Sequence, residues 1–253
     1  MGRLRLLALV VLPTLLVGAV IAGVLVVDAL DRREQVAEAD AAAERYTQQH
    51  EAFREALAGS VDSADFEDVD RVRSAVAAAR EDVPTLPAVG EHGAESSEGY
   101  RFARRVHQLT ETNLVDLESA LDRAEEAQAF AADAERALDV DPRSFLTTTT
   151  VPSGAPVRAS VIPPMQSALA RFEAVEVPEG GDDAADEVSG ALRFVIGEAE
   201  TLARELDAGR GYQFEFGLRY GEARGAVQQY VTAVVAEVRE AFDLVVGEPA
   251  GQV

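Results

Sequence analysis

An uncharged run of 22 residues, from Leu6 to Val27, constrains the fold of this chain more than any other feature. At a rise of about 1.5 Å per residue, a helix of that length spans about 33 Å, close to the ~30 Å hydrocarbon core of a lipid bilayer. The run therefore predicts a membrane helix or a signal sequence. The most apolar later stretch, Val227 to Val246, is interrupted by charged residues and two glutamines, so we predict that the chain crosses the membrane once.

The length of the run favours an uncleaved anchor over a cleaved signal peptide. A signal peptide usually has an apolar region of about 7–15 residues followed by a small-residue cleavage site, whereas the candidate sites here, after Ala19 and Ala22, lie inside the run. Arginines flank both ends, but the five residues before the run include no acid, which favours a cytoplasmic N-terminus. We predict a cytoplasmic tail and signal-anchor over residues 1–27, with the C-terminal domain extracytoplasmic at the cell membrane.

Every basic residue of the chain is an arginine, and the chain has no lysine and no cysteine. Residues 28–253 hold 21 of the 23 arginines and all 45 acidic residues, which gives them a net charge of −24. Such a charge repels nucleic acid and anionic lipid headgroups, so the sequence excludes nucleic acid as a partner. The lack of cysteine excludes disulfides, thiolate metal ligands and cysteine nucleophiles.

Apolar residues recur at steps of three and four along most of the chain after the anchor, which is typical of amphipathic helices. A short helix is also predicted after Pro163 and Pro164, and no alternating strand pattern competes. The sequence therefore predicts an all-α fold, an N-terminal transmembrane helix followed by an antiparallel multi-helix bundle. The main apolar stripes run over residues 36–57, 66–83, 100–138, 188–206 and 212–246.

A stretch rich in threonine and proline, residues 143–160, separates two helical parts of the bundle. The predicted domains are a first helical half over residues 28–142, this loop, a second half over 161–246 and a flexible tail over 247–253. Each half contains Gly-Tyr-x-Phe at the start of a long helix, at Gly99–Phe102 and at Gly211–Phe214. Two interpretations stay open: an internal duplication that gives two three-helix halves, or a chance match.

The chain lacks the usual catalytic motifs. No serine lies in Gly-x-Ser-x-Gly or Ser-x-x-Lys, and the one Gly-x-Gly, at Gly209–Gly211, lies between two predicted helices rather than after a strand. The three histidines fit no zinc-binding pattern, and acidic pairs are too common to single one out. We predict that the protein is not an enzyme and needs no metal or cofactor.

The only candidate ligand site is a group of arginines near the start of the helix that Gly99 precedes. The helix macrodipole disfavours cations there, so a nearby group should offset them. One interpretation assigns that role to carboxylates such as Glu95 and Glu98. The alternative is a positive pocket, built with aromatic side chains of both halves, that holds an anionic group of a ligand or envelope polymer. The candidate ligand-binding residues are Arg101, Arg104, Arg105, Tyr100 and Tyr212.

These features favour a membrane-tethered, outward-facing acidic helical bundle with a structural or protein-interaction role. The alternative is an extracytoplasmic sensor that binds a small anion and acts through a partner membrane protein. The predicted partners are the lipid bilayer, through Leu6 to Val27, and an unidentified membrane or envelope protein. A homodimer through the anchor is a further possibility, because Gly18 and Ala22 form a small-xxx-small pair that lets two membrane helices approach closely.

Overall fold

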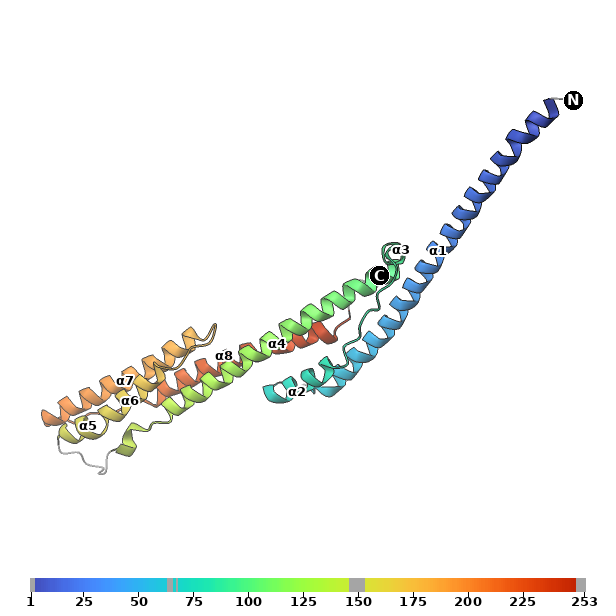
Figure 1. The fold of residues 1–253 in the computed structure, drawn as a ribbon. Coiled ribbons are helices and arrows are strands. Elements are labelled where there is room, and N and C mark those ends of the chain that lie inside the picture. The colour runs from blue at the N-terminus through green and yellow to red at the C-terminus, as the bar shows by residue number, and fades with distance from the viewer. Residues whose placement is uncertain (1–2, 63–65, 67, 146–152, 249–253) are drawn as a thin grey trace. The chain divides into compact units, whose positions relative to one another are not determined.

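The fold was analysed in a computed structural model, which describes residues 3–62, 66, 68–145 and 153–248, with the backbone alone for residues 3–27. Within these ranges the regular structure is entirely helical, with no strand (Figure 1). The predicted all-α helical bundle is therefore confirmed. The helices are α1 (Arg3–Ser60), α2 (Val69–Arg80), α3 (Glu91–Ser96), α4 (Glu98–Leu138), α5 (Ala155–Ser160), α6 (Ile162–Phe172), α7 (Asp182–Asp207) and α8 (Gly217–Val246), with a 3-10 turn at Pro142–Phe145.

The helix ends lie near the ends that the apolar stripes predict. Helix α4 covers the predicted 100–138 stripe, and α7 ends at Asp207, just after its last stripe residue. Two short helices lie in stretches without an apolar stripe, α3 between the stripes that end at residue 83 and begin at residue 100, and α5 within the loop predicted over residues 143–160. Each has six residues, less than two turns, so neither repeats its apolar pattern often enough to be recognised in sequence.

The predicted membrane segment, Leu6 to Val27, falls within α1, and its side chains lie outside the described residues. Among the residues whose side chains the structure describes, no helix is both long and apolar enough to cross a membrane. Helix α1 is continuous from Arg3 to Ser60, so the backbone of the predicted anchor and that of the first predicted stripe form one helix.

The chain divides into two compact units, each assembled from separated segments. Unit 1 consists of residues 1–61, 75–113 and 245–253, and unit 2 of residues 62–74 and 114–244. Because α2, α4 and α8 each contribute to both units, the units do not follow the order of the sequence. The predicted halves on either side of residues 143–160 stay a prediction.

In unit 1, helix α1 packs on α3 and on the first part of α4. Three alanines of α1 allow this approach, and Gly93 of α3 brings the two backbones together, since a Cβ on Gly93 would lie 2.2 Å from the carbonyl oxygen of Gln35. Ser97 precedes α4 and accepts a hydrogen bond from the Tyr100 N–H at 2.9 Å, as an N-cap does. Its hydroxyl donates to Asp40 of α1 at 2.5 Å. The buried core includes Ala39, Ala42, Ala43, Tyr46, Tyr100, Ala103 and Val106.

Unit 2 is built from the first part of α2 and the later part of α4, together with α5, α6, α7 and most of α8. Its described core is formed mainly by valine, leucine and alanine, with Phe130 and Phe172 in contact at 5.8 Å between ring centroids. Gly154 marks a close approach of α5 to α7, because a Cβ there would lie 2.1 Å from the Ala203 carbonyl oxygen. The apolar stripes predict that seven residues on their inward faces, distributed over both units, are buried, and each of them is buried: Phe53, Val76, Leu117, Leu192, Leu202, Val234 and Val238.

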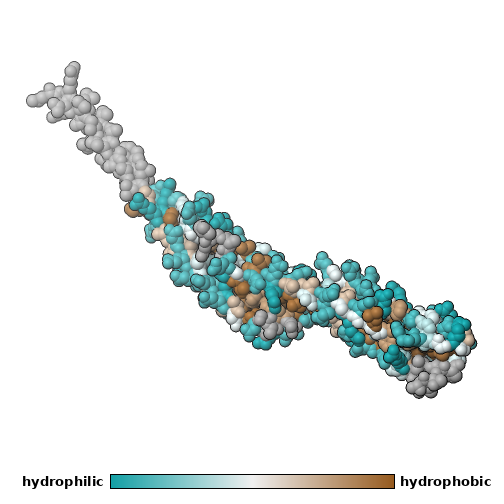
Figure 2. All heavy atoms as spheres, turned by 180° about the vertical axis from the view of Figure 1, so that it is seen from behind, coloured by the Kyte–Doolittle hydropathy of each residue, from teal (hydrophilic) through white to brown (hydrophobic). Residues whose placement is uncertain are grey.

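The surface of both units is mainly hydrophilic on the face that Figure 2 shows, as expected for a chain of net charge −22. Scattered hydrophobic patches interrupt it. The large apolar side chain with the highest exposure among those identified is Leu218 of α8, with 78 % of its surface exposed.

Candidate functional site

Unit 1 contains a buried polar cluster where α1 faces α4. Tyr46 and His50 lie one turn apart on α1, with their rings stacked at 5.7 Å between centroids. His107 of α4 meets the Tyr46 ring edge-on at 5.7 Å. Thr110, one turn further along α4, completes the cluster, and Tyr46, His50 and Thr110 are each at least 95 % buried.

A hydrogen bond joins the two helices within this cluster. The Thr110 hydroxyl donates to the Val106 carbonyl at 2.9 Å, so its oxygen is left to accept. The Nε2 of His50 lies 2.8 Å from that oxygen, and it must therefore carry the proton and donate. His50 is thus assigned as the Nε2–H tautomer of a neutral imidazole.

Burial holds both ionisable rings in their neutral forms. It lowers the pKa of His50 to about 4. The nearby positive charge of Arg54 also lowers this pKa, and the interaction with His107 adds a smaller effect in the same direction. It raises the pKa of Tyr46 to about 12; the Thr110 hydroxyl opposes this rise and Glu111 adds to it. Neither group exchanges a proton near neutral pH, so the cluster is not suited to general acid–base catalysis.

Two polar atoms of the cluster have no hydrogen-bond partner among the described residues. They are the Tyr46 hydroxyl and the Nδ1 of His107, both fully buried. The Thr110 hydroxyl lies near the phenol but forms no well-aligned hydrogen bond with it. Because most buried polar atoms in proteins are paired, these two atoms mark a place where a water molecule or a small ligand would gain hydrogen bonds.

A pocket of about 80 Å³ opens beside the cluster. It is lined by Tyr46 and His50, and Arg54, Glu51 and Glu248 bring charged groups to it. Arg54 is held in place, because its Nε and Nη2 donate to the Val246 carbonyl at 2.9 and 2.7 Å. This volume holds a few water molecules or a ligand of several heavy atoms.

Metal binding finds no support in the described part of the chain, where no three His, Asp or Glu side chains are grouped so as to hold an ion. The carboxylates of Glu51 and Glu248 line the pocket, while the neutral His50 uses its Nε2 proton for Thr110. The arrangement can therefore offer hydrogen bonds and a guanidinium to a small polar molecule.

The residues predicted from sequence lie in both units. Three arginines are exposed along the first turns of α4: Arg101, Arg104 and Arg105. Arg101 lies 3.9 Å from the carboxylate of Glu98, which is the kind of ion pair expected if nearby carboxylates offset the arginines. Tyr100 is buried and its hydroxyl donates to the Pro87 carbonyl at 2.8 Å.

Tyr212 belongs to unit 2, where its hydroxyl donates to Glu198 of α7 at 2.7 Å. Tyr100 and the three arginines share α4 in unit 1, and the described contacts of Tyr212 are with its own unit. The anion site that combines them stays a prediction.

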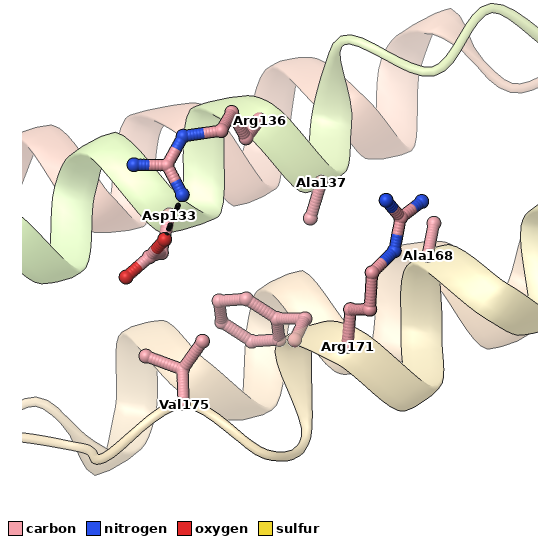
Figure 3. A pocket seen from close by; sticks show the side chains of 7 residues that line it. Asp133, Arg136, Ala137, Ala168, Arg171 and Val175 are labelled. Atoms are coloured by element: carbon pink, nitrogen blue, oxygen red, sulfur yellow. Dashed lines mark hydrogen bonds and ion pairs between the residues drawn. The ribbon is translucent and has the colours of Figure 1, made fainter.

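A second pocket, of about 100 Å³, lies in unit 2 between α4 and α6 and was not predicted (Figure 3). Arg136 and Arg171 line it from the two helices, together with Ala137 and Ala168. Arg136 is paired with Asp133, and the Arg171 Nε donates to the Ser167 carbonyl of its own helix. Both arginines are exposed, so water competes for any anion that they attract.

Comparison with protein-family models, with curated proteins and with solved structures gave no match.

The sequence contained a usable signal for the polar cluster. Tyr46, His50 and Thr110 all fall at inward positions of apolar stripes, and the stripes predicted their burial correctly. Polar residues at inward positions of two helices indicate a buried polar contact. A stripe does not show, however, which other helix packs against it. His107 lies beside its stripe rather than on it, so its contact with Tyr46 had no sequence signal.

Proposed function

We propose that the chain is a membrane-tethered, outward-facing acidic helical bundle with a structural or protein-interaction role. The tether is the uncharged run from Leu6 to Val27, inserted as a single-pass signal-anchor. The strongly acidic remainder forms an extracytoplasmic domain whose charge keeps it soluble and away from anionic headgroups.

The continuity of α1 is the observation that carries this proposal. The helix is unbroken from Arg3 to Ser60, so the uncharged run and the segment packed in unit 1 are connected without a linker. A helix is stiff over this length compared with a flexible coil. Movement of the anchor is therefore transmitted to the segment of α1 that packs in unit 1. Such rigid coupling suits a domain that holds a fixed position at a membrane surface and binds other proteins there.

Membrane fractionation of the full chain with a C-terminal tag tests the tether. We expect the protein to stay in the membrane pellet after washes with high salt and alkaline carbonate. A variant with Val17→Arg and Val20→Arg should lose this behaviour, because a charge at the centre of a membrane helix costs roughly 2.5–3.5 kcal/mol. The matched control, Gln48→Arg with Gln49→Arg, adds the same charges at exposed positions of the same helix and should stay in the pellet.

Protease treatment of intact cells tests the orientation. An outward-facing domain predicts loss of the C-terminal tag, whereas a protected tag would contradict the proposed side of the membrane. Release into the medium of a chain that starts near Val20 or Gly23 would show instead that the run is a cleaved signal peptide.

A second candidate function, favoured by the unpartnered Tyr46 hydroxyl, is the sensing of a small ligand on behalf of a partner membrane protein. Thermal-shift measurements of the full chain with acetate, phosphate and glycerol would test it. A shift lost in Tyr46→Phe assigns binding to the pocket in unit 1. A shift lost when Arg101, Arg104 and Arg105 are all replaced by glutamine assigns it to the predicted anion site. If no probe changes the melting temperature, the ligand-sensing function is not supported, and the structural or protein-interaction role is the one that remains.

A further inference from the structure

The pocket of about 80 Å³ beside the buried polar cluster is lined by charged groups of both signs. We call it the Tyr46 pocket. It lies entirely within unit 1, so its geometry depends on that unit alone. The lining residues that present polar, charged or apolar groups to a ligand are Tyr46, Glu51, Arg54, Phe102, Val106 and Glu248.

Arg54 and Glu51 line this pocket without forming an ion pair. They are three residues apart on α1, a spacing that brings helical side chains together, and the same spacing pairs Arg101 with Glu98 on α4 at 3.9 Å. The Arg54 guanidinium instead donates to the Val246 carbonyl. Among the described residues, neither Arg54 nor Glu51 has an ion-pair partner. The pocket therefore keeps an unneutralised charge of each sign.

The two kinds of charge lie at different depths. Arg54 is half-buried, whereas Glu51 and Glu248 are exposed. Glu248 also lacks an ion-pair partner in the part of the chain that the structure describes. Water screens the exposed carboxylates more than it screens the guanidinium. The pocket is therefore positive on its inner side and negative at its mouth.

Tyr46 adds a buried donor to the inner side. Its hydroxyl is fully buried and has no hydrogen-bond partner among the described residues. The Nη1 of Arg54 is left to donate as well, because the bonds to Val246 use Nε and Nη2. A carboxylate accepts hydrogen bonds at both oxygens, and those from a guanidinium are the stronger kind. With Phe102 and Val106 as apolar walls, the inner side suits a carboxylate on a short apolar group.

A zwitterion matches both charges of the pocket, whereas a simple ion matches one. An anion alone is repelled by the two carboxylates and by a chain of net charge −22, and a cation alone meets the guanidinium. The volume holds about six non-hydrogen atoms. We propose that the Tyr46 pocket binds a small α-amino acid, with its carboxylate on Arg54 and Tyr46 and its ammonium group toward Glu51 and Glu248. The amino acid is then the ligand of the second candidate function, on which this proposal rests.

Calorimetric titration of the full chain in mild detergent tests the ligand class with matched probes. L-Alanine carries both charges, propionate lacks the ammonium group, and ethylamine lacks the carboxylate, while the apolar part stays similar. We expect L-alanine to bind. Propionate and ethylamine should each bind at least roughly tenfold more weakly, because each loses one charge-assisted contact.

Substitutions locate the binding. Tyr46→Phe removes the buried hydroxyl and Glu51→Gln removes a charge at the mouth, so each should weaken L-alanine binding roughly five- to tenfold. Glu51→Gln should not weaken propionate binding, because propionate has no ammonium group. Arg54→Gln should weaken both, and circular dichroism checks that each variant keeps its helices. The matched control, Glu44→Gln, removes an exposed carboxylate of α1 outside the pocket and should change the affinity less than about twofold.

The contrary results are distinguishable. Propionate or ethylamine that binds as tightly as L-alanine would overturn the zwitterion. L-Alanine binding that is unchanged in Tyr46→Phe and in Glu51→Gln would place the ligand at another site. If L-alanine does not bind while acetate gives a thermal shift that depends on Tyr46, the proposal fails but the pocket still senses an anion. If no probe binds, the second candidate function fails with it, while the membrane tether is tested separately by fractionation.

Discussion

The Tyr46 hydroxyl and the His50 ring are buried in the same polar cluster, but they differ in how well their hydrogen bonds are satisfied. His50 donates to Thr110, whereas the Tyr46 hydroxyl has no partner among the described residues. An unsatisfied buried hydroxyl costs about 1–3 kcal/mol, while a typical hydrogen bond contributes about 0.5–1.5 kcal/mol. The two kinds of group therefore respond in opposite ways to substitution.

Removing the Tyr46 hydroxyl should leave stability unchanged or increase it. We expect Tyr46→Phe to raise the free energy of unfolding by up to about 1 kcal/mol, because a buried donor without a partner is lost. The matched control, Tyr100→Phe, removes a hydroxyl that donates to the Pro87 carbonyl and should lower it by about 0.5–1.5 kcal/mol. Urea unfolding measures both. Equal losses in the two variants would mean that a bound water or ligand satisfies the Tyr46 hydroxyl.

His50 should make the folded state sensitive to mild acid. Its pKa is about 4 in the folded chain and 6.5 in the unfolded chain, so between these values the unfolded state binds more protons and stability falls as pH falls. One such group lowers the free energy of unfolding by at most about 1.4 kcal/mol per pH unit. The effect starts near pH 6.5 and is complete below about pH 4.

Comparison with His50→Gln isolates this contribution, because glutamine keeps a donor for Thr110 but does not titrate. We expect the parent to lose more stability than the variant between pH 7 and pH 5, measured by urea unfolding at both. Parallel pH profiles would show that His50 is accessible to water in the folded state and that its pKa is not lowered.

At the scale of single elements, periodicity predicted the helices of several turns but not α3 and α5, which have fewer than two turns each. Helices α4, α7 and α8 repeat their stripes over several turns, so local sequence determines them. Helices α3 and α5 have six residues each and depend on tertiary contacts, at Gly93 against α1 and at Gly154 against α7. The sequence shows that a glycine is present but not which backbone approaches it.

Substituting Gly154 tests this tertiary dependence. We expect Gly154→Ala to lower the free energy of unfolding by roughly 1–3 kcal/mol, because the new Cβ would overlap the Ala203 carbonyl oxygen and the backbone must move. Gly197, in the interior of α7, has no described atom within 4 Å of an added Cβ. Gly197→Ala should therefore raise stability by up to about 1 kcal/mol through helix propensity alone. Thermal unfolding of both variants gives the comparison, and a similar effect at the two positions would contradict the close approach of α5 to α7.

At the scale of the whole molecule, composition determines the electrostatics more than any single ion pair does. The chain has 45 acidic residues and 23 arginines. Its ion pairs are mostly solvent-exposed, including the pairs of Arg224 with Glu135 and Asp139, both at 3.0 Å. Exposed pairs contribute about 0–1 kcal/mol each, so repulsion among the excess carboxylates should dominate the effect of salt.

Sodium chloride should therefore stabilise the fold. Raising its concentration from about 20 mM to about 500 mM shortens the screening length from roughly 20 Å to a few ångströms, which weakens carboxylate repulsion more than it weakens short-range pairs. We expect the urea midpoint at pH 7 to rise. Chloride is preferable to sulfate here, because sulfate also strengthens the burial of apolar surface.

A charge variant distinguishes repulsion from other effects of salt. Glu126→Gln with Glu200→Gln removes two exposed carboxylates of unit 2 and takes the net charge from −22 to −20. The double variant should be more stable than the parent at low salt, and the difference should shrink as salt screens the charges that remain. A urea midpoint that falls with added chloride would show the reverse balance, with the arginine–carboxylate pairs outweighing the repulsion among unpaired acids.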